Sequence, residues 1–195
     1  MSLILSSNSP RRKQLLAGLG LPFEVRVLPD INESYPDDLQ VEDVPIFIAC
    51  EKAQAYLSSI QPDDLVITAD TVVVLGDKIL GKPADANQAK AMLRALSGKT
   101  HRVITGVCIT GVEVQRSFAV ISHVTFKELE DAEIDFYVDH YEPFDKAGAY
   151  GIQEWIGYIG VTGLQGSYFN VMGLPVQRIY EELKSLGVNV LNADS

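Results

Sequence analysis

The sequence has few cysteines and no long apolar run, and each shortage excludes a class of protein. Its 195 residues include two cysteines, Cys50 and Cys108, whose spacing fits neither a zinc site nor a redox motif. We expect two reduced and largely buried thiols, because free cysteine packs as a small hydrophobe. No apolar run approaches the roughly 20 residues that cross a bilayer, so no membrane contact is expected. The first residues lack the basic start and long apolar core of a signal peptide, and we expect a cytoplasmic location.

Positive charge is also scarce. The chain has 16 Lys and Arg residues against 26 Asp and Glu residues, which gives a net charge of -10 at pH 7. Because proteins bind nucleic acid by neutralising phosphates with Lys and Arg, we expect no nucleic acid partner. A small phosphorylated ligand is compatible with this balance, since it needs only a local cluster of cations.

Strand-like and helix-like patterns alternate along the chain. Apolar and β-branched patterns predict strands over residues 3–5, 22–28, 65–76, 101–110 and 114–126, the last two joined as a hairpin around Gly111. Caps and helical periodicity predict helices over residues 10–20, 43–57, 85–98, 129–141 and 175–187. Residues 29–38 are predicted to form an acidic loop, and residues 147–175 loops and a short hairpin. We therefore expect one α/β domain, residues 1–195, with a mixed, twisted sheet.

The first predicted helix begins with an unfavourable arrangement of charge. Ser9 and Pro10 are typical of an N-cap and a first helical position. The positive end of the helix dipole then meets Arg11, Arg12 and Lys13, each of which should cost up to roughly 1 kcal/mol. This arrangement calls for an explanation beyond helix stability.

Residues 76–83 match the phosphate-binding P-loop motif only in part. Gly76, Gly81 and Lys82 have the spacing of that motif, but Pro83 stands where a Ser or Thr should bind magnesium. Gly76 also falls in a predicted hairpin turn instead of at a strand-to-helix junction. We therefore expect no P-loop, although Lys82 remains a candidate for contact with phosphate by another geometry.

Several polar residues are ambiguous when taken one at a time. Asp70 interrupts an apolar strand, either as a strand-end residue bonded to the backbone or as a carboxylate that binds a cation or accepts a proton. Glu33 is expected to be a solvated charge and Lys52 a surface lysine. His101 is interpreted as a structural hydrogen-bonder in preference to a catalytic base. Lys146 is expected to share a solvated turn with the preceding aspartate.

Taken together, the segments resemble the Maf family of nucleoside triphosphate pyrophosphatases. The resemblance rests on motifs that follow one another in family order and at family spacing over nearly the whole chain. They are "SSNSPRR", "EKAQA", "ADTVVV", "GKP", "LSGKTHRVITGV", "DKAGAYGIQ" and "VMGLP". The resemblance implies an elongated α/β fold with two lobes and a central cleft, related to the inosine triphosphate pyrophosphatases.

The resemblance also implies the reaction. In this family a nucleoside triphosphate is cut between its α- and β-phosphates, which gives the monophosphate and pyrophosphate. The reaction requires a divalent metal ion, Mg²⁺ or Mn²⁺. The family suggests a homodimer, a house-cleaning role in the nucleotide pool and a link to arrest of cell division. A triphosphate at the helix N-terminus would explain the unfavourable cations, since one ion pair at ~4 Å and an effective dielectric of ~20 has a gross attraction of about 4 kcal/mol.

The resemblance assigns roles to residues of this sequence. Asp70 matches the catalytic base or metal-associated carboxylate, and Glu33 matches a second acidic residue at the metal. The positions around the triphosphate are matched by Ser7, Arg12, Glu33, Lys52 and Lys82. The positions that separate subfamilies are matched by Arg11, Thr71 and Gln153, which agree with the branch acting on dTTP and UTP.

Three departures and two alternatives stay open. Glu154 stands where the family usually has Gly, and Ser6 and Ser122 replace the usual Ala and Thr. Because Glu154 adjoins a base-reading position, it affects substrate preference more than catalysis. One alternative is a non-catalytic nucleotide-binding regulator of septum formation. The other is a pyrophosphatase for purine or methylated nucleotides.

Overall fold

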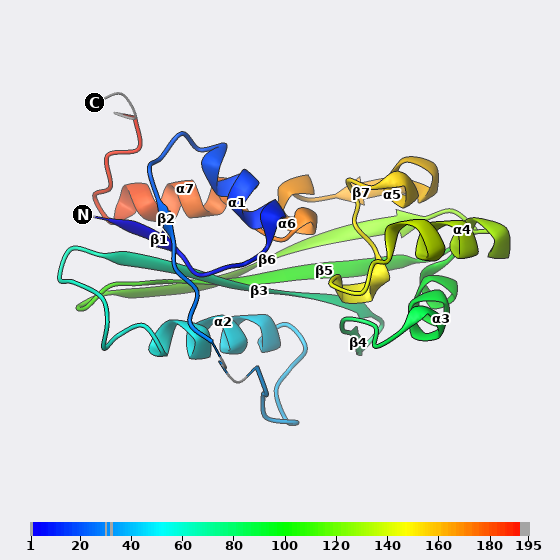
Figure 1. Cartoon of the computed structure of the whole chain (residues 1–195), viewed down its shortest axis with the longest axis horizontal. Helices are drawn as coiled ribbons and strands as arrows, with labels where there is room; N and C mark the ends of the chain where they lie inside the picture. The colour runs from blue at the N-terminus through cyan, green and yellow to red at the C-terminus, as the bar shows by residue number, and fades with distance from the viewer. Residues whose placement is uncertain (1, 30, 32, 192–195) are drawn as a thin grey trace. The chain divides into compact units, whose positions relative to one another are not determined.

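The computed structural model describes residues 2–29, 31 and 33–191, which form an α/β fold on one mixed sheet (Figure 1). Its strands are β1 (Leu3–Leu5), β2 (Glu24–Val25), β3 (Leu65–Leu75), β4 (Lys78–Leu80), β5 (Thr100–Thr110), β6 (Gln115–Phe126) and β7 (Val161–Gln165). Its helices are α1 (Pro10–Ala17), α2 (Val44–Gln54), α3 (Ala86–Leu96), α4 (Asp131–Tyr141), α5 (Trp155–Gly160), α6 (Tyr168–Met172) and α7 (Val176–Ser185), with a 3₁₀ turn η1 (Ala147–Ala149).

The sheet has the strand order β2-β1-β3-β5-β6-β7, and β4 pairs with β3 outside this path. β1 runs parallel to β2 and β3, whereas β4 is antiparallel to β3 and β7 is antiparallel to β6. The prediction of an α/β fold with a mixed sheet is therefore confirmed.

Two compact units make up the chain. The first comprises Met1–Asp70, Thr105–Val120 and Gly173–Ser195, and the second comprises Thr71–Ile104 and Ile121–Met172. The long strands β3, β5 and β6 each contribute residues to both units. The residues proposed from the sequence are likewise distributed over both.

In the first unit, β1 leads the chain directly to the N-terminus of α1. Ser9 is the N-cap, and its hydroxyl accepts the backbone N–H of Arg12 at 3.4 Å. β1 pairs with β3 so that Leu5 lies opposite Ile67, and the amide of Ser6 donates to the Ile67 carbonyl. The end of β1 and the start of α1 therefore lie beside β3, and the predicted helix start is confirmed.

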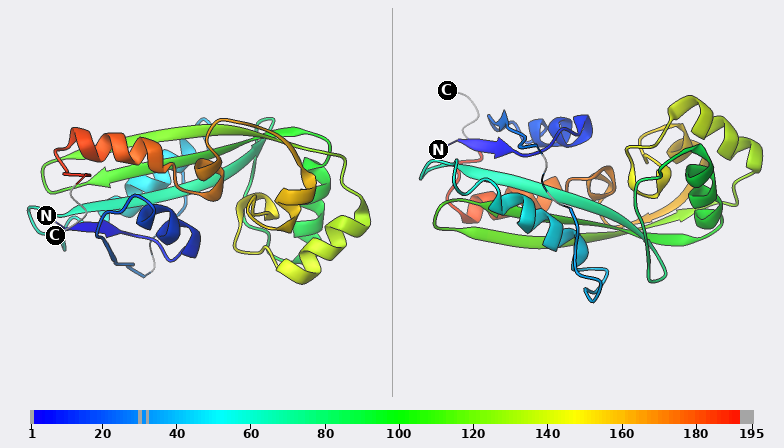
Figure 2. Two further views of the ribbon diagram at one scale, coloured as in Figure 1. Left: turned by 90° about the horizontal axis from the view of Figure 1, so that it is seen from above. Right: turned by 60° about the horizontal axis from the view of Figure 1, so that its bottom comes forward.

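Helices cover both faces of the strands in the first unit, with α2 on one face and α1 and α7 on the other (Figures 1 and 2). α2 approaches β5 closely at Gly106, where a Cβ would lie 2.2 Å from the carbonyl carbon of Pro45. Thr68 of β3 donates its hydroxyl to the carbonyl of Ala49 at 2.6 Å, and it lies 3.3 Å from the carbonyl oxygen of Cys108. The absence of a side chain at Gly106 thus sets how near α2 lies to the strand.

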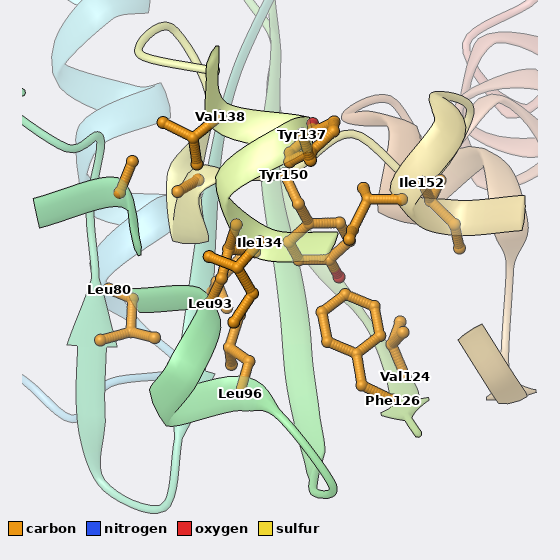
Figure 3. Close-up of a cluster of buried hydrophobic side chains, with 14 of the residues drawn as sticks. Leu80, Leu93, Leu96, Val124, Phe126, Ile134, Tyr137, Val138, Tyr150 and Ile152 are labelled. Carbon is orange, nitrogen blue, oxygen red and sulfur yellow. The ribbon is translucent and has the colours of Figure 1, made fainter. Parts of the chain in front are cut away.

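The second unit has its own apolar core, to which α3, α4 and the strand ends contribute (Figure 3). Its buried members include Leu80, Leu93, Leu96, Val124, Phe126, Ile134, Tyr137, Val138, Tyr150 and Ile152. His101 is buried against it, with Nε2 2.6 Å from the Tyr150 hydroxyl and its ring edge-on to Phe126. This burial supports the interpretation of His101 as a structural hydrogen-bonder.

The prediction of loops and a short hairpin over residues 147–175 is wrong. This segment contains α5, α6 and β7, and β7 pairs with β6 across an irregularity between Thr125 and Phe126. The strand predicted over residues 22–28 is reduced to β2. The predicted loop over residues 29–38 is free of helix and strand where it is described, and Asp30 and Asn32 lie outside the described residues.

Among the described residues, no helix combines the length and the hydrophobicity that crossing a bilayer demands.

Candidate active site

The centre of the candidate site is a lysine that bridges two carboxylates. Lys52 of α2 places its Nζ 3.0 Å from Oδ1 of Asp70 and 2.9 Å from Oε1 of Glu33. The side chains of Lys52 and Asp70 are only 12% and 16% exposed, whereas that of Glu33 is 52% exposed. Asp70 is therefore held in one orientation on a rigid strand, while Glu33 closes the group from the solvent side.

Arg12 lies beside this group. Its Nε donates to the carbonyl of Gly173 at 2.7 Å, and one Nη donates to the carbonyl of Ala69 at 2.9 Å. Burial lowers the pKa of the Arg12 guanidinium, while the charges of Asp70 and Glu33 act in the opposite direction. Arginine nevertheless stays protonated in proteins. A fixed cation is thus positioned next to the residue that precedes Asp70.

The connection between β1 and α1 carries two further predicted residues. Ser7 is buried, and its hydroxyl accepts the backbone N–H of Ser9 at 3.2 Å. Arg11 is half-buried, and its charge acts on that of Arg12. The first unit therefore brings the cations Arg11, Arg12 and Lys52 together with the acids Glu33 and Asp70. The interpretations of Glu33 as a solvated charge and of Lys52 as a surface lysine are incomplete, since the two side chains pair with each other.

The other predicted residues belong to the second unit. Thr71 of β3 is half-buried, and Lys82 is exposed in the segment after β4. The carbonyl of Gly81 accepts the N–H of Gly148 at 3.1 Å, which ties the Lys82 segment to the one that leads to Gln153. Oε1 of Gln153 is buried, and no hydrogen-bond partner for it is found in the described part of the chain. Such an acceptor is suited to a donor that a ligand would supply.

A charged network beside Gln153 was missed from the sequence. The side chain of Lys146 is only 9% exposed and pairs with Asp145 at 2.8 Å and with Glu154 at 3.0 Å. Glu154 also accepts the hydroxyl proton of Tyr137, which in turn accepts the N–H of Gly151 at 3.1 Å. The interpretation of Lys146 as part of a solvated turn is wrong. The Gly and aromatic residues around it in "DKAGAYGIQ" were the available signal of burial.

Two other features do not provide a nucleotide site. Gly76 lies in the β3–β4 turn with φ of 62°, and the next helix begins only at Ala86, so the exclusion of a P-loop is confirmed. The second unit also has an open hollow of about 290 Å³. It is lined by Ile152, Gly157, Tyr158, Val161, Leu164 and Tyr168. None of these is charged, so the hollow does not match the charge of a triphosphate.

The carboxylates of Glu33 and Asp70 are the candidate ligands for a divalent metal ion. Within residues 2–29, 31 and 33–191 there is no group of three or more His, Cys, Asp or Glu that could hold a metal ion. Glu33 and Asp70 nevertheless contact one ammonium group, so their oxygens lie no farther apart than the sum of the two contacts. Mg²⁺ is commonly bound by one or two carboxylates, waters and substrate phosphates. This pair therefore fits a cation that arrives with a phosphorylated ligand.

Comparison with known proteins identifies relatives over almost the full length. The family model described as "Maf-like protein" matches residues 2–186. A protein of Phocaeicola vulgatus named dTTP/UTP pyrophosphatase is 62% identical over 184 residues, which are 94% of this chain and 95% of that protein. A Porphyromonas gingivalis protein of the same name is 54% identical over 187 residues, 95% of this chain and 94% of that protein.

Solved structures show a weaker similarity. A nucleoside-triphosphatase, also titled dITP/XTP pyrophosphatase, from Mycobacterium abscessus aligns with a TM-score of 0.45 at 13% identity, covering 98% of this chain and 99% of that chain. Similarity at this level does not by itself establish a shared fold.

Proposed function

Because the chain belongs to the Maf family, we propose that it is a nucleoside triphosphate pyrophosphatase that hydrolyses dTTP and UTP to the monophosphate and pyrophosphate. The names of relatives that are 54% to 62% identical over nearly the whole chain support this substrate class. The observation that carries the proposal is the group formed by Lys52, Asp70 and Glu33, with Arg12 beside it. A chain that only bound nucleotide would not need an ordered carboxylate there.

Asp70 is the proposed catalytic base. It accepts a proton from the water whose oxygen attacks phosphorus at the α–β anhydride, and the bond to the departing pyrophosphate breaks. Lys52 orients the Asp70 carboxylate through their 3.0 Å contact and keeps a positive charge next to the reacting phosphates. The rigid strand β3 supplies the positional precision that such a proton transfer requires.

The phosphate tail is the proposed ligand of the cations. Arg12 and Arg11 lie at the N-terminus of α1, where backbone N–H groups and guanidinium groups can bind the same oxygens. Ser7 lies in the connection that leads to this helix, and we assign it a polar contact with the phosphates. Lys82 is the proposed phosphate contact from the second unit.

Recognition of the base is proposed for Thr71 and Gln153. The N3–H of uracil or thymine is a hydrogen-bond donor, and the buried Oε1 of Gln153 is an acceptor of the kind that such a donor requires. Cytosine and adenine present an acceptor, N3 and N1 respectively, at the corresponding position, so a site built around an acceptor disfavours these two bases.

A divalent cation, Mg²⁺ or Mn²⁺, is proposed as the cofactor, held by Asp70 and Glu33 together with the phosphates of the substrate. When bound, such an ion neutralises charge on the phosphoryl oxygens and makes a coordinated water more acidic. Lys52 already contacts both carboxylates, and this contact keeps the pair compact before the nucleotide arrives.

We further propose that residues 1–195 act as one catalytic domain, as a homodimer, in the cytoplasm. Its partner is then a small-molecule nucleoside triphosphate, and its role is removal of unwanted pyrimidine nucleotides from the pool. A connection with septum formation would follow from that role.

The test is release of pyrophosphate from a panel of natural and modified triphosphates with Mg²⁺ or Mn²⁺. We expect dTTP and UTP to be hydrolysed faster than purine nucleotides. Asp70→Asn should lower kcat by at least about 100-fold while the fold survives. Asp77→Asn, a change at an exposed turn residue, is the matched control and should leave kcat unchanged.

The alternatives give different results in the same experiment. A regulator that only binds nucleotide would show tight binding by calorimetry and negligible turnover. A purine or methylated-nucleotide enzyme would release pyrophosphate from those substrates first. Full activity of the Asp70→Asn variant would reject the mechanism.

A further inference from the structure

The two cysteines of the chain, 58 positions apart in the sequence, meet in the first unit. Cys50 lies on α2, and Cys108 lies on β5, the strand against which α2 packs. Cys50 also packs against a buried cluster of Ala49, Ala53 and Cys108. Because the chain has no other cysteine, a disulfide within one molecule can only join these two.

The contact follows from the close approach of α2 to β5. A Cβ at Gly106 would lie 2.2 Å from Pro45, so the first turn of α2 rests directly on the strand. About one turn later, the hydroxyl of Thr68 donates to the carbonyl of Ala49 at 2.6 Å. The packing of α2 against β5 and β3 therefore holds Cys50 close to the strand that carries Cys108.

The two sulfurs are not equivalent. Cys50 is half-buried, and its pKa lies below that of an ordinary thiol chiefly because Cys108 donates a hydrogen bond to it, with a second from Ser117. The same hydrogen bond and burial raise the pKa of Cys108, which is fully buried and lies 3.2 Å from the hydroxyl of Thr110. The negative charge of Glu51 and the burial of Cys50 act against its ionisation but do not reverse the direction. A half-buried thiol with a lowered pKa therefore lies beside a fully buried thiol, which is the arrangement of an attacking and a resolving cysteine.

We propose that Cys50 and Cys108 form a peroxide-oxidisable pair that closes to an intramolecular disulfide. In the first step, the Cys50 thiolate attacks one oxygen of a hydroperoxide. The O–O bond breaks, the sulfur loses two electrons to become a sulfenic acid, and the leaving alkoxide or hydroxide takes a proton. In the second step, Cys108 attacks that sulfur. The S–S bond forms, the S–O bond breaks, and hydroxide leaves with the Cys108 proton as water. A dithiol reductant reverses the change.

The measurement is made on the reduced full-length protein after exposure to one equivalent of hydrogen peroxide. The sample is denatured, treated with N-ethylmaleimide and weighed by mass spectrometry. Before oxidation each molecule should carry two maleimide groups. After oxidation it should carry none, weigh two hydrogen atoms less, migrate as a monomer on a non-reducing gel, and recover both groups after dithiothreitol.

Two variants test whether Cys50 is the attacking cysteine and Cys108 the resolving cysteine. In Cys108→Ser, the Cys50 sulfenic acid should persist and be trapped by dimedone. In Cys50→Ser, the buried Cys108 should react with hydrogen peroxide at least about tenfold more slowly than Cys50 does in the wild type. The proposal is overturned if wild-type protein keeps both maleimide groups, if it forms linked dimers instead, or if Cys50→Ser loses its thiol as fast as wild type does. The readout is the thiols themselves, so the result is independent of the proposed hydrolase activity.

Discussion

Mild acid should weaken the fold through a single buried histidine. His101 is 1% exposed in the second unit, its Nε2 bonds to the Tyr150 hydroxyl, and the described residues provide no hydrogen-bond partner for its Nδ1. Protonation would put a charge and a second N–H donor into apolar surroundings. Desolvation accordingly lowers the pKa of His101 from 6.5 to about 4.

The size of this loss in unfolding free energy follows from the number of protons that the folded and unfolded states bind. Between about pH 6.5 and pH 4, the unfolded chain binds a proton at residue 101 that the folded chain does not, so the free energy of unfolding falls as the pH falls. Each unit of difference in pKa corresponds to 1.36 kcal/mol, so the loss over this window is about 3 kcal/mol. The stabilisation is complete above pH 6.5, and below pH 4 His101 adds no further dependence.

The assay is urea denaturation at a series of pH values from 8 to 4, for wild type and for His101→Asn. The substitution also removes packing, so the quantity to compare is the slope of unfolding free energy with pH and not its value. We expect the slope of the variant to be smaller by about 1 kcal/mol per pH unit within the window. The exposed His140 provides the control, and His140→Asn should keep the wild-type slope. Equal slopes for wild type and His101→Asn would refute the reasoning.

Three other changes have defined expectations. Gly106→Ala places a methyl group against α2 and should destabilise the fold by about 1–3 kcal/mol in denaturant titration, whereas Gly81→Ala, where the added Cβ meets open space, should change it little. Glu154→Ala removes one of the two carboxylates that contact Lys146, and also the acceptor of the Tyr137 hydroxyl, while the exposed Asp145 keeps its contact with Lys146. It should lower the unfolding free energy by about 2 kcal/mol, and a change below about 0.5 kcal/mol would contradict this. Lys52→Met should reduce kcat by about 100-fold while dTTP still binds by calorimetry, and unchanged turnover would remove Lys52 from the mechanism.

Local sequence rules were sufficient where an element is determined by its own residues. The N-cap Ser9 and the following proline predicted the start of α1, and Asp85 predicted that of α3, where its carboxylate accepts the N–H of Gln88. The β-branched run after Leu65 predicted β3. In these segments capping and side-chain pattern agree with the tertiary fold, so nothing had to override them.

The prediction for residues 147–175 was wrong because the helices and the strand in this segment are too short to be stable alone. α5 spans six residues and α6 five, below the length at which an isolated helix forms in water. α5 exists because Trp155 and Ile156 pack against the core of the second unit. β7 exists because β6 offers a pairing edge. Both causes are contacts with distant parts of the chain, which a local pattern does not contain.

In the candidate site, too, single residues could be predicted from the local sequence, whereas their contacts with distant residues could not. Asp70 was detectable as a carboxylate within an apolar strand, but its contact with Lys52 joins a helix to a strand and has no local signature. Only the resemblance to the family, which rests on the order of its motifs, placed Lys52 and Asp70 in one site. The burial of Lys146 was missed because its partner Glu154 occupies a position where the resemblance led us to expect Gly.

The central claim is that the chain cuts the α–β anhydride of a pyrimidine nucleoside triphosphate, and phosphorus NMR of UTP mixed with the purified protein and Mg²⁺ tests it most directly. The account predicts that the three UTP resonances are replaced by those of UMP and pyrophosphate. UDP with inorganic phosphate, or an intact UTP spectrum after prolonged incubation, would contradict it.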